Sequence, residues 1–102
     1  MGRGQVLSPA KDMADSRLKE AEAEADLTLA RADLANARQR VLEVGSMLRR
    51  AVLFFSRAEL RGFLKELVTA RTEVAEAKKQ VGAARKRVEM ARQKVKSVAA
   101  TL

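Results

Sequence analysis

The sequence holds neither cysteine nor histidine, so the charged side chains available for catalysis or ligand binding are carboxylates, lysines and arginines. The missing cysteines exclude disulfides and thiolate chemistry, and the missing histidines remove the usual general base and a common zinc ligand. Catalysis by the remaining groups would need a pocket, which so thin a chain is poorly suited to build. We therefore expect a protein that is not an enzyme and has no cofactor and no metal site.

The residues best placed to bind another molecule lie near the middle of the chain, in the stretch RRAVLFFSRAEL at 49–60. We predict an apolar interaction surface there, made of Met47, Leu53, Phe54, Phe55, Phe63 and Leu64. The phenylalanines either fold inward as a plug, dock onto a protein partner or a second copy, or insert into a membrane surface. Five apolar residues between arginines make a weak anchor, so we do not expect membrane binding.

Apolar residues recur every seven positions in the second half, at Leu60, Leu67, Val74, Val81, Val88, Val95 and Leu102. Three residues after each of the first six stand Phe63, Ala70, Ala77, Ala84, Ala91 and Val98. In heptads lettered a to g, these are the a and d positions of a coiled-coil helix. The first half repeats the pattern with Leu27, Leu34, Val41 and Leu48 at a, and Ala30, Ala37, Val44 and Ala51 at d. Two similar helices are predicted.

Capping signals mark where these helices begin. Pro9 suits the first position of a helix, and Ser56 with Glu59 forms the S-x-x-E pattern of a capping box. After a flexible tail at residues 1–8, we predict a helix at 9–52, a tight turn at 53–56 and a second helix at 57–101.

The charge distribution favours a hairpin over the alternative, one continuous helix that assembles between molecules. Residues 12–26 carry six acids against two bases, and residues 85–99 carry six bases against one acid. Folding at the turn lays the basic block on the acidic block and pairs large residues with small ones in each core layer, such as Leu34 with Ala77. We therefore predict an all-α protein, a long antiparallel two-helix coiled-coil hairpin spanning residues 9–102.

The core of such a hairpin is thin. Each layer buries one Val or Leu, which contributes about 1.5 to 3 kcal/mol, and one Ala. Ordering the backbone costs about 1 to 2 kcal/mol per residue. We therefore expect self-association or a partner helix to complete the hairpin, as a homo-oligomer or as a subunit of a larger assembly.

One flank of the predicted hairpin is basic. Its heptad e positions hold Arg31, Arg38, Arg71, Lys78, Arg85 and Arg92. On the other flank, formed by g positions, Arg40 is predicted to meet Glu73 and Asp26 to meet Arg87. Because like charges do not stabilise the hairpin, the e residues are either solvated or form an electrostatic surface for an acidic partner, such as another protein's helix or a phosphate backbone.

The net charge of +8 leaves open a second function, a basic rod that binds nucleic acid without sequence specificity. Residues 57–102 hold 12 bases and 5 acids, so most of the excess lies there. Part of it faces the acidic block of the first helix, and no aromatic platform or zinc motif accompanies it. Nucleic acid is therefore the weaker alternative.

After the turn, Ser56 opens a Ser-x-x-Glu-Leu start that alanine-rich heptads follow, and the first arm carries ADLTLARADLANARQRV. In both respects the chain resembles the α-helical hairpin of bacterial periplasmic adaptor proteins in tripartite efflux and type I secretion systems. The resemblance implies a tip that contacts an outer-membrane channel. The family's tip motif is matched at Arg49 and Leu53, but Ser56 comes three residues after Leu53 rather than seven. Small coiled-coil stalk proteins of type III secretion and flagellar export share the same design.

We therefore expect a non-enzymatic structural or adaptor protein that works by helix–helix contact. The N-terminal stretch MGRGQVLSPA has no signal-peptide pattern, and no run approaches the 18 or so apolar residues that span a bilayer. The expected location is intracellular, in the cytoplasm, or periplasmic if the chain is the hairpin of an adaptor protein.

Overall fold

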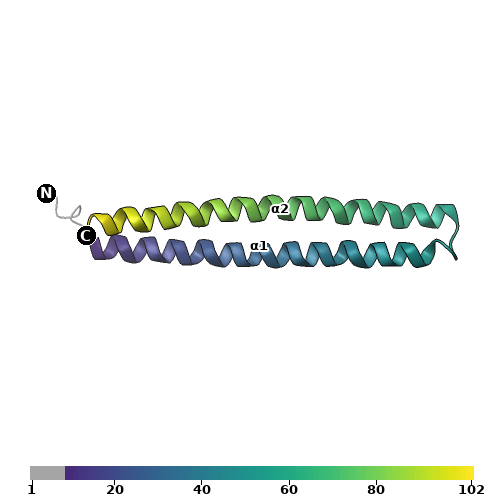
Figure 1. Ribbon diagram of the computed structural model, residues 1–102, viewed down its shortest axis with the longest axis horizontal. Helices are drawn as coiled ribbons and strands as arrows, with labels where there is room; N and C mark the ends of the chain where they lie inside the picture. The colour runs from purple at the N-terminus through teal and green to yellow at the C-terminus, as the bar shows by residue number, and fades with distance from the viewer. Residues whose placement is uncertain (1–8) are drawn as a thin grey trace. The chain divides into compact units, whose positions relative to one another are not determined.

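The computed structural model describes residues 9–102, and the segment predicted as a tail lies outside this described part. Two helices make up nearly all of it: α1 spans Pro9–Ala51 and α2 spans Arg57–Ala100. Each helix begins at the residue that its start signal indicates and ends one residue before the predicted boundary. The chain is all-α, and the two helices form the predicted antiparallel hairpin (Figure 1).

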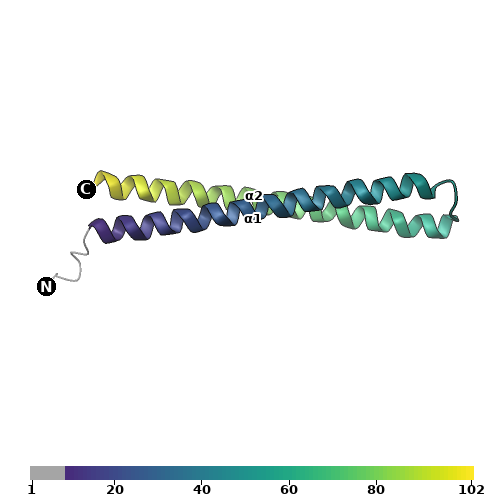
Figure 2. The same cartoon turned by 90° about the horizontal axis from the view of Figure 1, so that it is seen from below.

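Two compact units divide the hairpin, and each contains a piece of both helices. The terminal unit combines α1 up to Leu29 with α2 from Gly82 onward, and the turn unit is Ala30–Val81. Within each unit α1 and α2 lie side by side and run in opposite directions, as two perpendicular views show (Figure 1 and Figure 2).

Small residues at a and d form the core of the turn unit. The buried side chains are Ala30, Val44, Ala51, Ala70, Ala77 and Val81. The larger a residues, such as Leu34, Leu48 and Leu67, are only half-buried. One neighbouring helix covers a leucine from one side only, so the core is thin, and no large side chain in residues 9–102 is fully buried.

The terminal unit continues the heptads on both helices, but on α1 it does so through residues that the sequence pattern did not reveal. On α2, Ala84, Val88 and Val98 are buried at predicted core positions. On α1, the register runs for two more repeats before Leu27, with Met13 and Glu20 half-buried at a and Ser16 and Ala23 buried at d. Serine and glutamate at core positions hide these repeats from a search for apolar residues.

Hydrogen bonds close the turn between the helices. The backbone N–H groups of Phe54 and Phe55 both donate to the carbonyl of Ala51, at 3.0 and 2.9 Å. At the start of α2, the Glu59 N–H donates to Ser56 Oγ at 3.3 Å, which is the first half of a capping box. The Glu59 carboxylate accepts the Ser56 hydroxyl at 3.2 Å instead of a backbone N–H. These bonds anchor both ends of the turn.

Candidate functional site

The turn presents two large apolar side chains to solvent. Leu53 is 80% exposed and Phe54 is 83% exposed, although both lie between hydrogen-bonded helix ends. Phe55 is 45% exposed, and its ring meets that of Phe63 edge-on, with centroids 5.6 Å apart and planes at 69°. The two neighbouring phenylalanines therefore differ: Phe55 packs back onto α2, and Phe54 is left outside.

The predicted apolar surface is only partly gathered at the turn. Met47 lines a shallow groove formed by α1 alone, with Leu42 among its neighbours. Leu64 lines another shallow groove, formed by α2 alone, with Val68. Leu53, Phe54 and the Phe55–Phe63 pair occupy the turn itself and the first residues of α2. We use the name turn patch for Leu53 and Phe54.

Basic residues precede and follow the turn patch in the sequence. Arg49 and Arg50 stand at the end of α1, while Arg57 and Arg61 begin α2, and all four are exposed. Glu59, the acid nearest in sequence, is engaged in the cap with Ser56. A partner that covers the turn patch would therefore meet positive charge around an apolar centre.

The predicted basic surface is split between the two units. In the turn unit, Arg38 and Arg71 line one shallow groove with Val41, Leu42 and Val74. Both arginines are exposed, and neither forms an ion pair with another described residue. The other two predicted residues of this unit, Arg31 and Lys78, are exposed at the same heptad position as these arginines.

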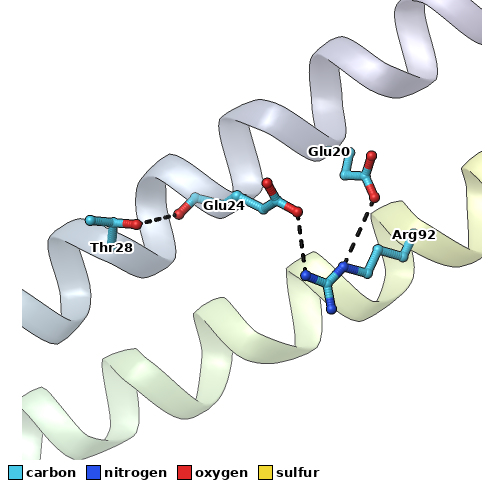
Figure 3. A network of polar contacts seen from close by, with 4 residues as sticks. All are labelled: Glu20, Glu24, Thr28 and Arg92. Carbon is cyan, nitrogen blue, oxygen red and sulfur yellow. Dashed lines mark hydrogen bonds and ion pairs between the residues drawn. The ribbon is translucent and has the colours of Figure 1, made fainter.

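In the terminal unit one residue of the predicted basic surface, Arg92, forms ion pairs with acidic residues. Its guanidinium lies 3.3 Å from Glu24 and 3.9 Å from Glu20 (Figure 3). The Thr28 hydroxyl donates to the backbone carbonyl of Glu24 on the same helix, at 3.0 Å (Figure 3). Arg92 is thus neutralised within the hairpin, whereas Arg85, also exposed, forms no ion pair with any described residue.

A second groove of the turn unit is acidic, and the sequence predicted its ion pair but not the groove itself. It is lined by Asp33, Asn36, Ala37, Arg40, Glu73, Glu76, Ala77 and Gln80. The predicted ion pair between Arg40 and Glu73 is formed, at 3.9 Å. The predicted pair of Asp26 with Arg87 is not among the ion pairs of the described residues. The sequence signal for this groove is the set of acidic and amide residues at the c and g positions of both helices, taken together.

Within residues 9–102, no group of three or more acidic residues comes together as a metal site would require. Neither described helix has a stretch long and apolar enough to cross a bilayer. Comparison with known proteins finds no matching family model, curated protein or solved structure. The geometry itself defines the class of protein: an all-α helical hairpin with an exposed apolar turn.

Proposed function

We propose that this chain is a non-enzymatic structural or adaptor protein that acts through helix–helix contacts, with the turn patch as its principal docking surface for a protein partner. The observation that carries this proposal is the exposure of Leu53 and Phe54, at 80% and 83%. Burying a side chain of this size contributes about 1.5 to 3 kcal/mol. Two adjacent ones are enough to anchor a small interface.

The turn supports this role because its conformation is already set. Hydrogen bonds from Phe54 and Phe55 to Ala51 fix one end, and the Ser56 cap fixes the other. Binding of a partner therefore carries little entropic cost for ordering the turn. The chemistry of the surface calls for a partner with an apolar pocket and an acidic rim, since Arg49, Arg50, Arg57 and Arg61 precede and follow the patch in the sequence.

An outer-membrane channel is the partner that the resemblance to periplasmic adaptor proteins implies. Arg49 and Leu53 have the spacing of that family's tip motif, and Leu53 is exposed. In that case the hairpin works in the periplasm. Without such a channel the proposed location is the cytoplasm, and fractionation of the cells that make the protein separates the two.

The turn patch is tested by the variant Leu53→Gln/Phe54→Gln. We expect it to keep its helical circular dichroism and to lose at least about tenfold in affinity for the partner, because both anchors are gone. The measurement is cross-linking of the full chain in its native cells, followed by titration of the protein captured.

The matched control is Leu18→Gln/Leu29→Gln, which alters two exposed leucines of α1 outside the turn. It should retain the partner. Equal capture by the two variants would show that the turn patch is not the docking surface.

Nucleic-acid binding is the second candidate function, and the groove between Arg38 and Arg71 favours it. The acidic groove in the same unit opposes it, since carboxylates repel a phosphate backbone. Binding to nucleic acid that weakens steeply as salt rises would support this candidate.

A further inference from the structure

Most charges in the turn unit are sorted by heptad position; the exceptions are Arg40 and Arg50 at g and c, and Lys65 and Lys79 at f. Every charged residue at positions b and e is basic: Arg31, Arg38, Arg49, Arg57, Arg61, Arg71 and Lys78. All of the unit's acids are at positions c and g: Asp33, Glu43, Glu59, Glu66, Glu73 and Glu76. We name the first set the basic flank and the second set the acidic flank. In a two-helix coiled coil, e and g positions border opposite sides of the core, so the two flanks face apart.

One groove on each flank of the turn unit is formed by both helices. Arg38 from α1 and Arg71 from α2 share the groove on the basic flank. Asp33 from α1 and Glu76 from α2 share the groove on the acidic flank. At these grooves each flank therefore presents charges from both helices and not a row of charges on a single helix.

Few of these charges are used inside the hairpin. On the acidic flank, Glu73 pairs with Arg40 and Glu59 caps α2. Asp33 and Glu76 form no ion pair with a described residue, and the same holds for Arg38 and Arg71. The terminal unit contrasts with this, because there Arg92 is matched by Glu20 and Glu24.

The apolar residues differ between the flanks in a complementary way. The basic flank carries the exposed side chains Leu42, which lines its groove with Arg38 and Arg71, and Leu64 and Val68, which line a second groove on α2. The acidic groove has the small residues Ala37 and Ala77 between its polar side chains. Large side chains on the basic flank and small ones in the acidic groove allow helices to approach closely where these two parts meet, away from Met47, the large exposed apolar residue of the acidic flank.

We propose that the basic flank of one copy of this chain docks side by side against the acidic flank of a second copy. The inference rests on the proposed function only in assuming that the hairpin works by helix–helix contact. Contact between two basic flanks would set arginines against arginines, so unlike flanks must meet. Such a contact is heterologous: each copy keeps one unused flank, and the assembly closes as a ring or grows by further copies.

Charge reversal on each flank tests this proposal in the full chain. Arg38→Glu/Arg71→Glu makes the groove on the basic flank acidic, and Asp33→Lys/Glu76→Lys makes the groove on the acidic flank basic. In about 0.01 to 0.1 M salt, where surface charges act over roughly 10 to 30 Å, the unchanged chain should have a mass above that of the monomer. Each variant should raise the dissociation constant at least about tenfold and sediment as a monomer.

Mixing the two variants provides the decisive step, because their unchanged grooves are complementary and their two altered grooves again carry opposite charges. An equimolar mixture should recover the mass of the unchanged chain. Lys79→Glu/Lys86→Glu is the matched control: it changes the net charge as much as the arginine variant does, but at exposed f positions outside both flanks. The control should keep the original mass, and circular dichroism should show that all variants remain helical.

Three results would overturn the inference: an unchanged chain that is monomeric at low salt, a reversed variant that keeps the original mass, or a mixture that does not recover it. Failure here is separable from failure of the proposed function. If only Leu53→Gln/Phe54→Gln lowers the mass, copies meet through the turn patch, and the flank proposal alone is wrong. If the flank variants behave as expected but the turn variant still captures its partner, the turn proposal alone is wrong.

Discussion

Phe54 and Phe55 are adjacent in the sequence but have different surroundings. Phe55 contacts the ring of Phe63, and Phe54 is almost wholly exposed. The aromatic pair ties the turn to the first helical residues of α2, so it contributes to stability. An exposed ring contributes little to folding and is therefore free to serve in binding.

Alanine substitutions at Phe55 and Phe54 compare the contributions of the two rings to the stability of the fold. Phe55→Ala should lower the free energy of unfolding by about 1 kcal/mol or more, since it removes an aromatic pair and half-buried apolar area. Phe54→Ala should change it by no more than about 0.5 kcal/mol. Urea unfolding followed by circular dichroism measures both. Equal losses would mean that the Phe55–Phe63 contact does not stabilise the turn.

Arg92 shows that neighbouring acids decide whether a basic side chain is available to a partner. The sequence places it in the same row of basic e positions as Arg38 and Arg71. Its guanidinium nevertheless lies beside Glu24 and Glu20, while Arg38 and Arg71 have no acid within ion-pair distance among the described residues. Exposed pairs of this kind contribute at most about 1 kcal/mol, so their main effect is to remove Arg92 from the surface available to a partner.

At the level of the helices, the tightest positions of the core are alanines. Ala70 in the turn unit and Ala84 in the terminal unit are both 0% exposed. Alanine favours helix formation and lets two helix backbones approach closely. Any larger side chain there must push the helices apart.

Substitution at two neighbouring alanines of α2 tests this close approach. Ala84→Leu should destabilise the chain by about 1 to 3 kcal/mol, because the core has no room for the added atoms. Ala83→Leu, at an exposed position on the same turn of helix, should change the stability by no more than about 0.5 kcal/mol. Thermal unfolding of the two variants in parallel gives the comparison, and a tolerant Ala84 would contradict the tight core.

Sequence periodicity predicted the two helices and their register from Leu27 onward, because those core positions hold apolar residues. It did not predict the repeats at Met13 to Ala23, since Ser16 and Glu20 are polar and only their burial shows the register. The turn was located by Ser56 and Glu59, which act through local hydrogen bonds. Which phenylalanine points outward depends on the fit of Phe55 against Phe63, and no local pattern encodes that fit.

For the molecule as a whole, the lack of any fully buried large side chain among the described residues limits the stability of a single copy. Folding free energy grows with the apolar area that is removed from water, and a second copy is one way to remove more. The proposed self-association would therefore contribute to folding stability as well as to assembly.

The unfolding temperature should consequently rise with protein concentration. Mass action stabilises a folded assembly, so a hundredfold increase in concentration should raise the midpoint by several degrees, as about 1 kcal/mol does for a domain of this size. Scanning calorimetry over that range of concentrations measures the shift. The midpoint of the variant Arg38→Glu/Arg71→Glu should not depend on concentration. A midpoint independent of concentration would indicate that one copy is stable by itself.

The sorting of charge in residues 30–81 also gives this segment an electric dipole directed across the helices and not along them. Helix dipoles in an antiparallel pair largely cancel, so the side-chain dipole is the one that remains. Near any charged surface the segment would turn one particular face towards it before making contact. This orienting torque acts within the screening distance, about 10 Å at 0.1 M salt. It restricts the relative orientations in which two copies first make contact.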